Sequence, residues 1–306
     1  MDSLAAAPGT GPATSPLPVL RKPRPAARFQ DLPTDRTLVM GILNVTPDSF
    51  SDGGKHATPD TDIAPGLRML YAGADIIDVG GESTRPGAED VSPEDEQRRV
   101  IPVIEALVKA GALVSIDTTH TSTAAAAVAA GAAIINDISG LSIEPEMAEL
   151  VAASKVPYIL THRRGDARTM NSHAEYDDVA AEVVAELAGV RDKLYAAGVE
   201  REQIIVDPGL GFAKNDAQNW DLLRNLDQLD SLGHKVLVGA SRKRFLGTLL
   251  TVAGKSAAPE ERDAATAAIT AISASRGAWA VRVHDVGPSL DAVKVAARMA
   301  AVPKTP

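Results

Sequence analysis

The most constraining feature of this sequence is a regular alternation, from Thr37 onward, of short apolar runs with segments of helical composition. The runs are almost continuously apolar, as parallel β-strands that are covered on both faces require. They read TLVMGILN, DIIDVGG, LVSIDT, AAIIND, VPYILTH, QIIVDPG, KVLVGAS and WAVRVHD. The helix candidates between them span residues 58–72, 93–110, 121–131, 144–153, 175–198, 216–230, 262–276 and 288–301.

Eight strands and eight helices predict one α/β domain, a (β/α)8 TIM barrel over residues 37–303. An open doubly wound sheet more often has about five to seven strands. A solenoid is disfavoured because no repeat of about 20–50 residues is visible. We expect residues 1–36 to be a flexible, disordered tail, because they are rich in Ala, Pro and Gly and show no periodicity. The late basic residues and the prolines of this tail disfavour an export signal.

The amino-acid composition and net charge indicate which classes of partner the protein can have. The chain has 306 residues, 45% of them apolar, which is ample for a large core. A net charge of -9 argues against binding to nucleic acid or to an anionic membrane, so we expect a small-molecule partner. Because the sequence has no cysteine, disulfides, thiolate catalysis and Cys-ligated zinc are excluded, and a cytoplasmic location fits. No run of about 18 uncharged apolar residues is present that would span a bilayer.

Polar residues stand where the apolar runs end. They are Asn44, Asp78 with Glu82, Asp117, Asn136, His162, Asp207, Ser241 with Lys243, and Arg282 with His284. Active sites of such barrels lie at the C-terminal ends of the strands, so these side chains should share one cavity. Any one of them could simply cap a helix or satisfy a turn. Burying the whole set at one mouth without a ligand would cost several kcal/mol, which favours a binding site.

The chemistry of this ring predicts a ligand with two different parts. Carboxylates and amides suit a heterocycle rich in N–H donors and carbonyl acceptors, and these residues are Asp117, Asp207, Asn136 and Asn44. Cations from the last two strands suit an anion, and these residues are Lys243, Arg282 and His284. Three loops rich in Gly and Pro should approach the ligand closely or close over it, at residues 46–55, 80–90 and 207–215.

At these residues the chain resembles the dihydropteroate synthase family, in its actinobacterial form. The resemblance covers residues 37–300 and rests on GILNVTPDSFSDGG, DVGGESTRPGA, SIDT, INDISG, DPGLGFAK, GASRKRFLG and RVHDV. It implies a transferase of folate biosynthesis in which p-aminobenzoate displaces pyrophosphate from 6-hydroxymethyl-7,8-dihydropterin pyrophosphate. It also implies Mg²⁺ as cofactor, a homodimer and a sulfonamide target. The implied mechanism is dissociative and has no covalent nucleophile.

The resemblance also implies roles for individual residues. The pterin contacts are Asp117, Asn136, Asp207 and Lys243. The pyrophosphate contacts are Asn44, which acts through Mg²⁺, Arg282 and His284. Positions near p-aminobenzoate and pyrophosphate are Phe50, Thr84, Arg85, Pro86 and Phe212, and Ser241 matches a contact to the p-aminobenzoate carboxylate. The residues implied to be catalytic are Asp117, Lys243, Arg282 and His284.

Several residues keep more than one interpretation. His162 is more simply explained as a structural histidine, and Thr161 stands where the family more often has methionine. Asp78 is interpreted as an anchor of the second loop, while Arg242 and Arg244 are either solvated or close to phosphate. The remaining histidines are interpreted as ordinary solvated residues, and they are His56, His120, His173 and His234. No HxH or HExxH spacing indicates a zinc site.

Two rival functions use a similar barrel. A methyltransferase barrel that binds methyltetrahydrofolate would share the pterin-holding Asp and Asn. It has no evident need for the STRPG loop or the RVH sequence. A non-catalytic pterin-binding homologue should have lost the SRK motif, the RVH motif or one of the loops, and all of them are present. The synthase is therefore the favoured hypothesis.

Overall fold

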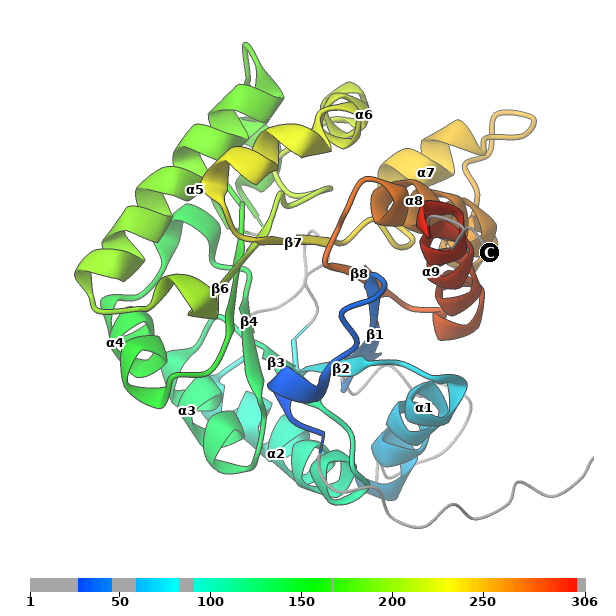
Figure 1. The fold of residues 1–306 in the computed structure, drawn as a ribbon. Helices are drawn as coiled ribbons and strands as arrows, with labels where there is room; N and C mark the ends of the chain where they lie inside the picture. The colour runs from blue at the N-terminus through cyan, green and yellow to red at the C-terminus, as the bar shows by residue number, and fades with distance from the viewer. Residues whose placement is uncertain (1–26, 46–58, 83–90, 167, 302–306) are drawn as a thin grey trace, which may run out of the picture.

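The eight strands form a closed barrel in which every strand is parallel to its neighbours. The computed structural model describes residues 27–45, 59–82, 91–166 and 168–301. The strands follow one another around the barrel in sequence order, β1 pairs with β8, and helices surround them (Figure 1). The predicted TIM barrel is confirmed.

The strands agree with the eight apolar runs. They are β1 Leu38–Asn44, β2 Ile76–Gly80, β3 Val114–Asp117, β4 Ile134–Asp137, β5 Tyr158–Thr161, β6 Ile204–Asp207, β7 Lys235–Val238 and β8 Ala280–Val283. The α-helices are α1 Pro59–Ala72, α2 Pro93–Lys109, α3 Thr121–Ala129, α4 Pro145–Ser154, α5 Val179–Ala196, α6 Asp216–Arg224, α7 Arg244–Leu249, α8 Asp263–Ser275 and α9 Val286–Ala300. Short 3-10 helices are η1 Phe29–Asp31, η3 Gly140–Ser142, η4 Met170–His173, η5 Arg201–Gln203, η6 Leu226–Leu232 and η7 Pro259–Arg262.

Two helices differ from the prediction. The segment predicted as one helix over 216–230 is α6, which ends at Arg224, followed by the separate 3-10 helix η6. The sequence analysis missed α7, because its six residues, RFLGTL, are too few for an apolar periodicity to be recognised. This helix follows Lys243 directly, so it belongs to the segment that leaves β7.

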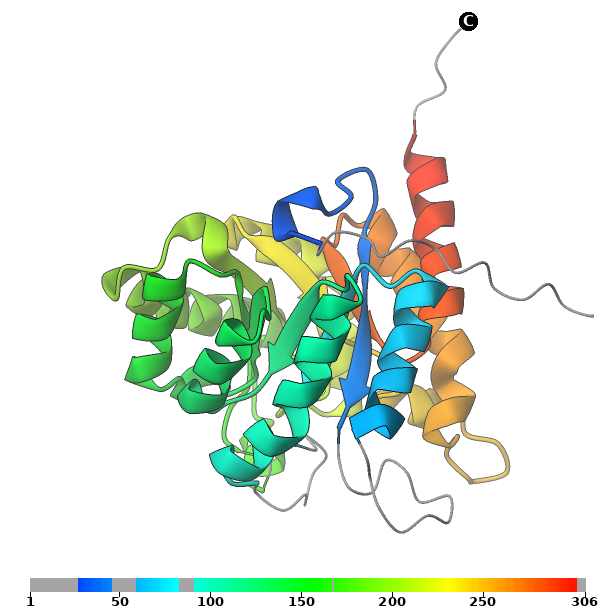
Figure 2. The ribbon, with the colours of Figure 1, turned by 90° about the horizontal axis from the view of Figure 1, so that it is seen from below.

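Side chains alternate between the helices and the barrel interior along each strand, as the pleat requires. An apolar layer inside the barrel is made of Leu38, Met40, Ile76, Leu113, Ile134, Ile159, Ile205, Leu237 and Ala280. At the N-terminal end of the barrel this layer is covered by Phe29, whose ring lies 5.8 Å from that of Trp279. The η1 turn therefore belongs to the segment that was predicted to be a tail, but it packs against the barrel. It lies at the N-terminal end of the barrel, opposite the end at which the strands finish (Figure 2).

Among the described residues, no helix is long and apolar enough to cross a membrane.

Candidate active site

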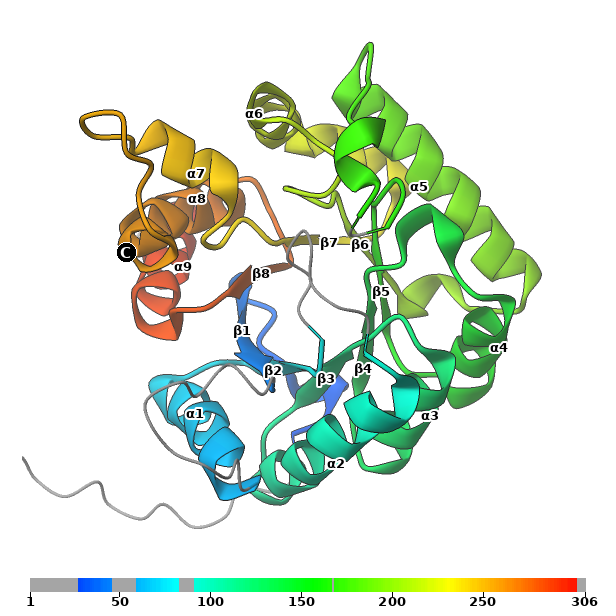
Figure 3. The same cartoon turned by 180° about the vertical axis from the view of Figure 1, so that it is seen from behind.

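Inward-facing positions two or four residues beyond the apolar layer are polar, and they come from different strands. They are Asp78 on β2, Asp117 on β3, Asn136 on β4, Asp207 on β6 and Arg282 on β8. The four acidic and amide side chains are all buried. Figure 3 shows the barrel from the end at which the strands finish, with the strands arranged around its axis. Five members of the ring predicted from the strand ends therefore lie in one layer inside the barrel.

Arg282 joins two carboxylates at the centre of this site. Its Nε donates to Asp78 Oδ2 at 2.6 Å, and its Nη2 donates to Asp117 Oδ2. Asn136 Nδ2 also donates to Asp78 Oδ2, at 3.0 Å. Asp78 thus connects β4 and β8 inside the barrel, while its interpretation as an anchor of the second loop concerns residues that are largely outside the described ones. Its second oxygen, Oδ1, is buried and accepts no hydrogen bond within the described protein.

This arrangement changes the expected distribution of charge. The sequence suggested carboxylates in one half of the mouth and cations in the other, but Arg282 lies between carboxylates. Burial raises the pKa of Asp117 to about 7, while the positive charge of Arg282 opposes that rise. Burial alone would lower the pKa of Arg282, but Asp78 and Asp117 raise it, so Arg282 stays charged. The carboxylate of Asp117 is therefore held in place by a permanent cation.

Asp207 and Lys243 approach one another beside Gly239. A Cβ atom on Gly239 would lie 3.4 Å from Asp207 Oδ2 and 3.9 Å from Lys243 Nζ, so glycine leaves room between them. Lys243 Nζ also donates to the Leu210 carbonyl and lies 4.7 Å from the centre of the Phe212 ring. Burial lowers the pKa of Lys243 to about 8, and Asp207 limits the fall. Burial raises the pKa of Asp207, which Lys243 partly offsets.

Ser241 and His284 form a second pair at this end of the barrel. Ser241 Oγ lies 3.0 Å from His284 Nδ1 and accepts a hydrogen bond of 3.1 Å from the His284 backbone N–H. Asn44 ends β1, pairs in register with Gly80 and is exposed. Its carboxamide oxygen is a hard donor of the kind that Mg²⁺ accepts alongside water and phosphate oxygens, so its chemistry fits the predicted metal contact.

Four of the predicted site residues are in segments outside the described residues. Phe50 belongs to the loop after β1, and Thr84, Arg85 and Pro86 belong to the loop after β2. Of the two arginines left open, Arg242 is paired with Asp263 at 2.7 Å, whereas Arg244 is largely exposed. Arg242 is therefore a structural residue.

The sequence analysis missed Glu96, Glu186 and Lys214. Glu96 on α2 is buried and accepts hydrogen bonds from Thr118 Oγ1 and His120, so the interpretation of His120 as an ordinary solvated residue was wrong. One potential metal ligand atom from each of Glu82, Glu96 and His120 lies within 4.8 Å of the others. In the sequence Glu96 resembles any acidic residue in the first turn of a helix, and nothing marks it as buried.

His162 is fully buried between Glu186 Oε2, at 2.8 Å, and Lys214 Nζ, at 2.9 Å. These contacts agree with a structural histidine. Lys214 is part of the DPGLGFAK motif, which was the only available signal for it.

Comparison with known proteins identifies the family. A sequence profile described as pterin binding enzyme matches residues 40–284. The chain belongs to this family.

Dihydropteroate synthase of Mycobacterium leprae is 50% identical over 259 residues, which are 84% of this chain and 91% of that protein. The solved structure of the Xanthomonas albilineans dihydropteroate synthase in complex with 7,8-dihydropteroate is 42% identical with a TM-score of 0.78, and the match covers 89% of this chain and 97% of that one. The Yersinia pestis dihydropteroate synthase in a sulfonamide drug complex is 40% identical with a TM-score of 0.80, over 88% of this chain and 96% of that one. This pterin-binding enzyme is therefore similar to dihydropteroate synthases along nearly the whole barrel.

Proposed function

We propose that this protein is a dihydropteroate synthase, a transferase of folate biosynthesis. It joins p-aminobenzoate to 6-hydroxymethyl-7,8-dihydropterin pyrophosphate and releases 7,8-dihydropteroate and pyrophosphate. The observation that carries the proposal is the buried polar layer at the strand ends, formed by Asp78, Asp117, Asn136, Asp207 and Arg282. The similarity to dihydropteroate synthases along the same residues supports it.

The pterin ring is the part of the substrate that suits this layer. A pterin carries adjacent N–H donors and a carbonyl acceptor, which match the carboxylates of Asp117 and Asp207 and the amide of Asn136. The Lys243 ammonium beside Asp207 supplies a donor for a ring acceptor. The buried Asp78 Oδ1 has no hydrogen-bond partner in the described protein and is a further acceptor within the same layer.

The pyrophosphate belongs on the side of Asn44 and His284. We propose that Asn44 contacts a bound Mg²⁺, which would neutralise charge on the diphosphate when bound. His284 and Arg282 add positive charge and donors on the same side. Ser241, which is hydrogen-bonded to His284, is a candidate contact for the p-aminobenzoate carboxylate.

The reaction then needs stabilisation of charge rather than a nucleophile. Departure of pyrophosphate leaves an electron-poor methylene conjugated to the pterin, and the Asp117 carboxylate favours this cation. At about 6 Å and an effective dielectric near 20, a unit charge pair is worth roughly 3 kcal/mol. That is roughly a hundredfold in rate if the interaction is felt only at the transition state. The p-aminobenzoate amine attacks the cation and loses a proton.

Assembly and inhibition follow from the same proposal. Exposed apolar side chains on α8 and α9, Ile272, Val295 and Met299, offer a face on which a homodimer could form. We also propose that sulfonamides compete with p-aminobenzoate here, as the Yersinia pestis complex suggests by similarity. A cytoplasmic location stays a prediction from the sequence.

A pyrophosphate-release assay tests the proposal, run with and without p-aminobenzoate and Mg²⁺. A synthase releases pyrophosphate and forms dihydropteroate when both p-aminobenzoate and Mg²⁺ are present, and it forms no dihydropteroate when either is left out. A methyltransferase barrel or a non-catalytic pterin-binding protein forms no dihydropteroate under any of these conditions. Absence of the product with both substrates and Mg²⁺ present would therefore overturn the assignment.

A further inference from the structure

The loop between β6 and α6 has a backbone shape that needs support. Gly209, Gly211 and Ala213 have φ of 68°, 78° and 47°, so alternate residues are left-handed. Ala213 adopts this conformation although L-residues with a Cβ avoid it. The loop also lies directly on the end of β5, because a Cβ on Gly209 would be 1.8 Å from the His162 carbonyl oxygen. Contacts from elsewhere must therefore hold the loop in this shape.

Lys214, near the end of the loop, provides those contacts from the side that faces away from the candidate active site. Its side chain is buried, and Nζ donates to the carbonyls of Gly209 and Phe212 at 3.1 and 3.0 Å. A third donation goes to His162 Nδ1 at 2.9 Å. An ammonium group has three protons, and here they meet three acceptors. Two of these acceptors are carbonyls of the loop backbone, so the lysine holds Gly209 and Phe212 close to one another.

His162 has the tautomer that this geometry requires. Its Nε2 lies 2.8 Å from Glu186 Oε2 and donates to that carboxylate, which leaves Nδ1 free to accept from Lys214. Burial, followed by the positive charge of Lys214, lowers the pKa of His162 to about 4. The imidazole is therefore neutral at physiological pH and remains an acceptor.

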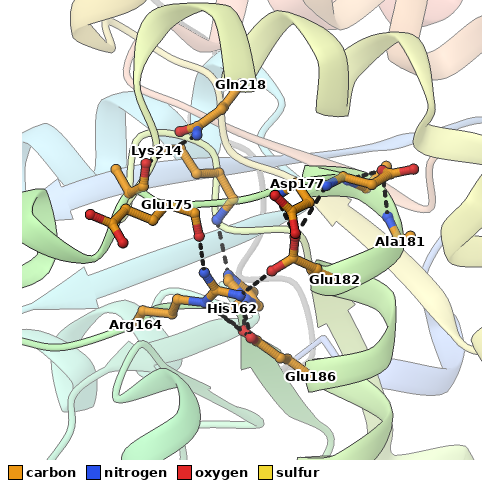
Figure 4. Close-up of polar contacts among 12 residues, drawn as sticks. His162, Arg164, Glu175, Asp177, Ala181, Glu182, Glu186, Lys214 and Gln218 are labelled. Carbon is orange, nitrogen blue, oxygen red and sulfur yellow. Dashed lines mark hydrogen bonds and ion pairs between the residues drawn. The ribbon is translucent and has the colours of Figure 1, made fainter.

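Glu186 connects this contact to helix α5. Arg164 donates from Nε to Glu186 at 3.0 Å and from Nη2 to Glu182 at 2.8 Å. Arg164 also donates to the Glu175 carbonyl, and its guanidinium lies 3.9 Å from the centre of the Tyr176 ring. Figure 4 shows Lys214 reaching His162 from above, while Arg164 lies beside His162 and contacts Glu186. The position of Lys214 is thus set by a helix on the outside of the barrel.

The opposite face of the loop belongs to the candidate active site. The Leu210 carbonyl accepts a hydrogen bond from Lys243, and the Phe212 ring lies 4.7 Å from Lys243 Nζ. Gly211 also packs closely there, since a Cβ on it would be 2.8 Å from Lys243 Cδ. The loop therefore lies between two lysines, one that faces the site and one that supports the loop from behind.

We propose that Lys214 is a positioning residue, which holds the β6–α6 loop in the shape in which Asp207 and Phe212 meet Lys243 and the substrates. The inference rests on the proposed function, because the substrates are those of the synthase. Lys214 itself does not touch the substrates, since its buried Nζ is surrounded by His162 and the two loop carbonyls. The same contacts make the loop depend on His162 and, through it, on Glu186.

Steady-state kinetics of Lys214→Met test this proposal. The variant keeps the length of the side chain but loses the three donors, so the loop should move relative to Lys243. We expect the KM for the pterin pyrophosphate and the KM for p-aminobenzoate to rise about tenfold, because both substrates use residues of the loop. The Kd of inorganic pyrophosphate, measured with Mg²⁺, should stay within about twofold of the wild-type value, because its contacts lie on other strands.

The KM values separate positioning from a merely structural role. Loss of folded enzyme lowers the apparent kcat and leaves KM unchanged, whereas a displaced loop raises KM. The matched control is Lys294→Met, which removes an exposed lysine on α9 and should leave both KM values unchanged. Wild-type KM values in folded Lys214→Met would overturn the proposal.

A second pair of variants covers the case in which Lys214→Met does not fold. His162→Asn keeps an oxygen acceptor near the position of Nδ1, whereas His162→Leu has no acceptor. We expect the KM values of His162→Leu to exceed those of His162→Asn by about fivefold, and equal values would contradict the proposal.

If the wild-type protein forms no dihydropteroate, the proposed function fails separately. Calorimetric binding of 6-hydroxymethyl-7,8-dihydropterin to Lys214→Met then still tests the positioning role, with an expected tenfold weaker Kd.

Discussion

Arg282 on β8 and Asp117 on β3 form a buried ion pair inside the barrel, although 165 positions separate them in the sequence. Asp78 on β2 accepts a second hydrogen bond from the same guanidinium, at 2.6 Å. One cation therefore balances two carboxylates in a region from which water is largely excluded. The ion pair orients the Asp117 carboxylate and opposes the protonation that burial favours, and an oriented carboxylate is what stabilisation of a pterin cation requires.

Asp117→Asn should lower kcat by about a hundredfold, while the Kd for 6-hydroxymethyl-7,8-dihydropterin changes by less than about threefold. The amide keeps the shape and one acceptor but removes the negative charge, which is worth roughly 3 kcal/mol at the transition state. Turnover and calorimetric binding at pH 8 measure the two effects.

The matched control is Asp137→Asn. Asp137 is also a buried carboxylate at a strand end, but it faces outward and accepts from the Tyr158 hydroxyl at 2.7 Å. Its substitution should change kcat by less than about threefold because it does not face the site. Unchanged turnover in Asp117→Asn would remove the cation-stabilising role.

Arg282→Ala should destabilise the protein at pH 8 by about 3–5 kcal/mol, because removal of one partner leaves buried carboxylates without a cation. The loss should be smaller at pH 5.5, because burial raises the pKa of Asp117 and its carboxyl can take up a proton in the variant. Urea denaturation at the two pH values measures both.

The Arg282→Ala variant should also bind inorganic pyrophosphate at least tenfold more weakly, while its affinity for a pterin without phosphate changes little. An equal loss of both affinities would contradict the assignment of Arg282 to the pyrophosphate.

The barrel could be predicted because each strand is short, parallel and covered on both faces, and this produces an uninterrupted apolar run. The position of Asp117 and Asp207 at strand ends could also be predicted, but their inward direction could not, because Asp137 also ends a strand and faces outward. Helix α7 could not be predicted, because its six residues contain too few turns to show a period. The packing of η1 against the barrel could not be predicted either, because it depends on the contact of Phe29 with Trp279.

The contacts within the site were less predictable than its members. Which strand-end residues pair depends on how the barrel closes, so the position of Arg282 between Asp78 and Asp117 was not visible in the sequence. Lys214 was missed for a different reason. Its burial depends on the left-handed backbone of the loop before it, and residue type alone does not specify that path.

Thr161→Val should stabilise the protein by about 1 kcal/mol. Thr161 lies in register with Asp207, and Ile159, two residues earlier, belongs to the interior layer, so Thr161 points inward. Its hydroxyl is buried and has no hydrogen-bond partner in the described protein, which costs about 1–3 kcal/mol. Valine has the same shape without the polar atom. The urea midpoint of the variant checks this.

Ser273→Ala is the control for Thr161→Val, since Ser273 on α8 also has a buried hydroxyl without a partner. We expect a similar gain in stability and no change in the KM for the pterin pyrophosphate. A Thr161→Val variant less stable than the wild type would show that the hydroxyl has a partner, such as ordered water, and would contradict the prediction.

The wild-type protein should gain stability relative to Lys214→Met between pH 7 and pH 9. Burial lowers the pKa of Lys214 from 10.5 to about 7, so above pH 7 the folded protein has lost a proton that the unfolded chain still holds. Stability rises with pH wherever the unfolded state binds more protons, here by up to about 2 kcal/mol over two pH units. Methionine has no such proton, and the other titrating groups, including Lys243, are shared by both proteins. Urea midpoints at the two pH values give the difference, and a difference that is constant or falls with pH would show that Lys214 keeps its proton throughout.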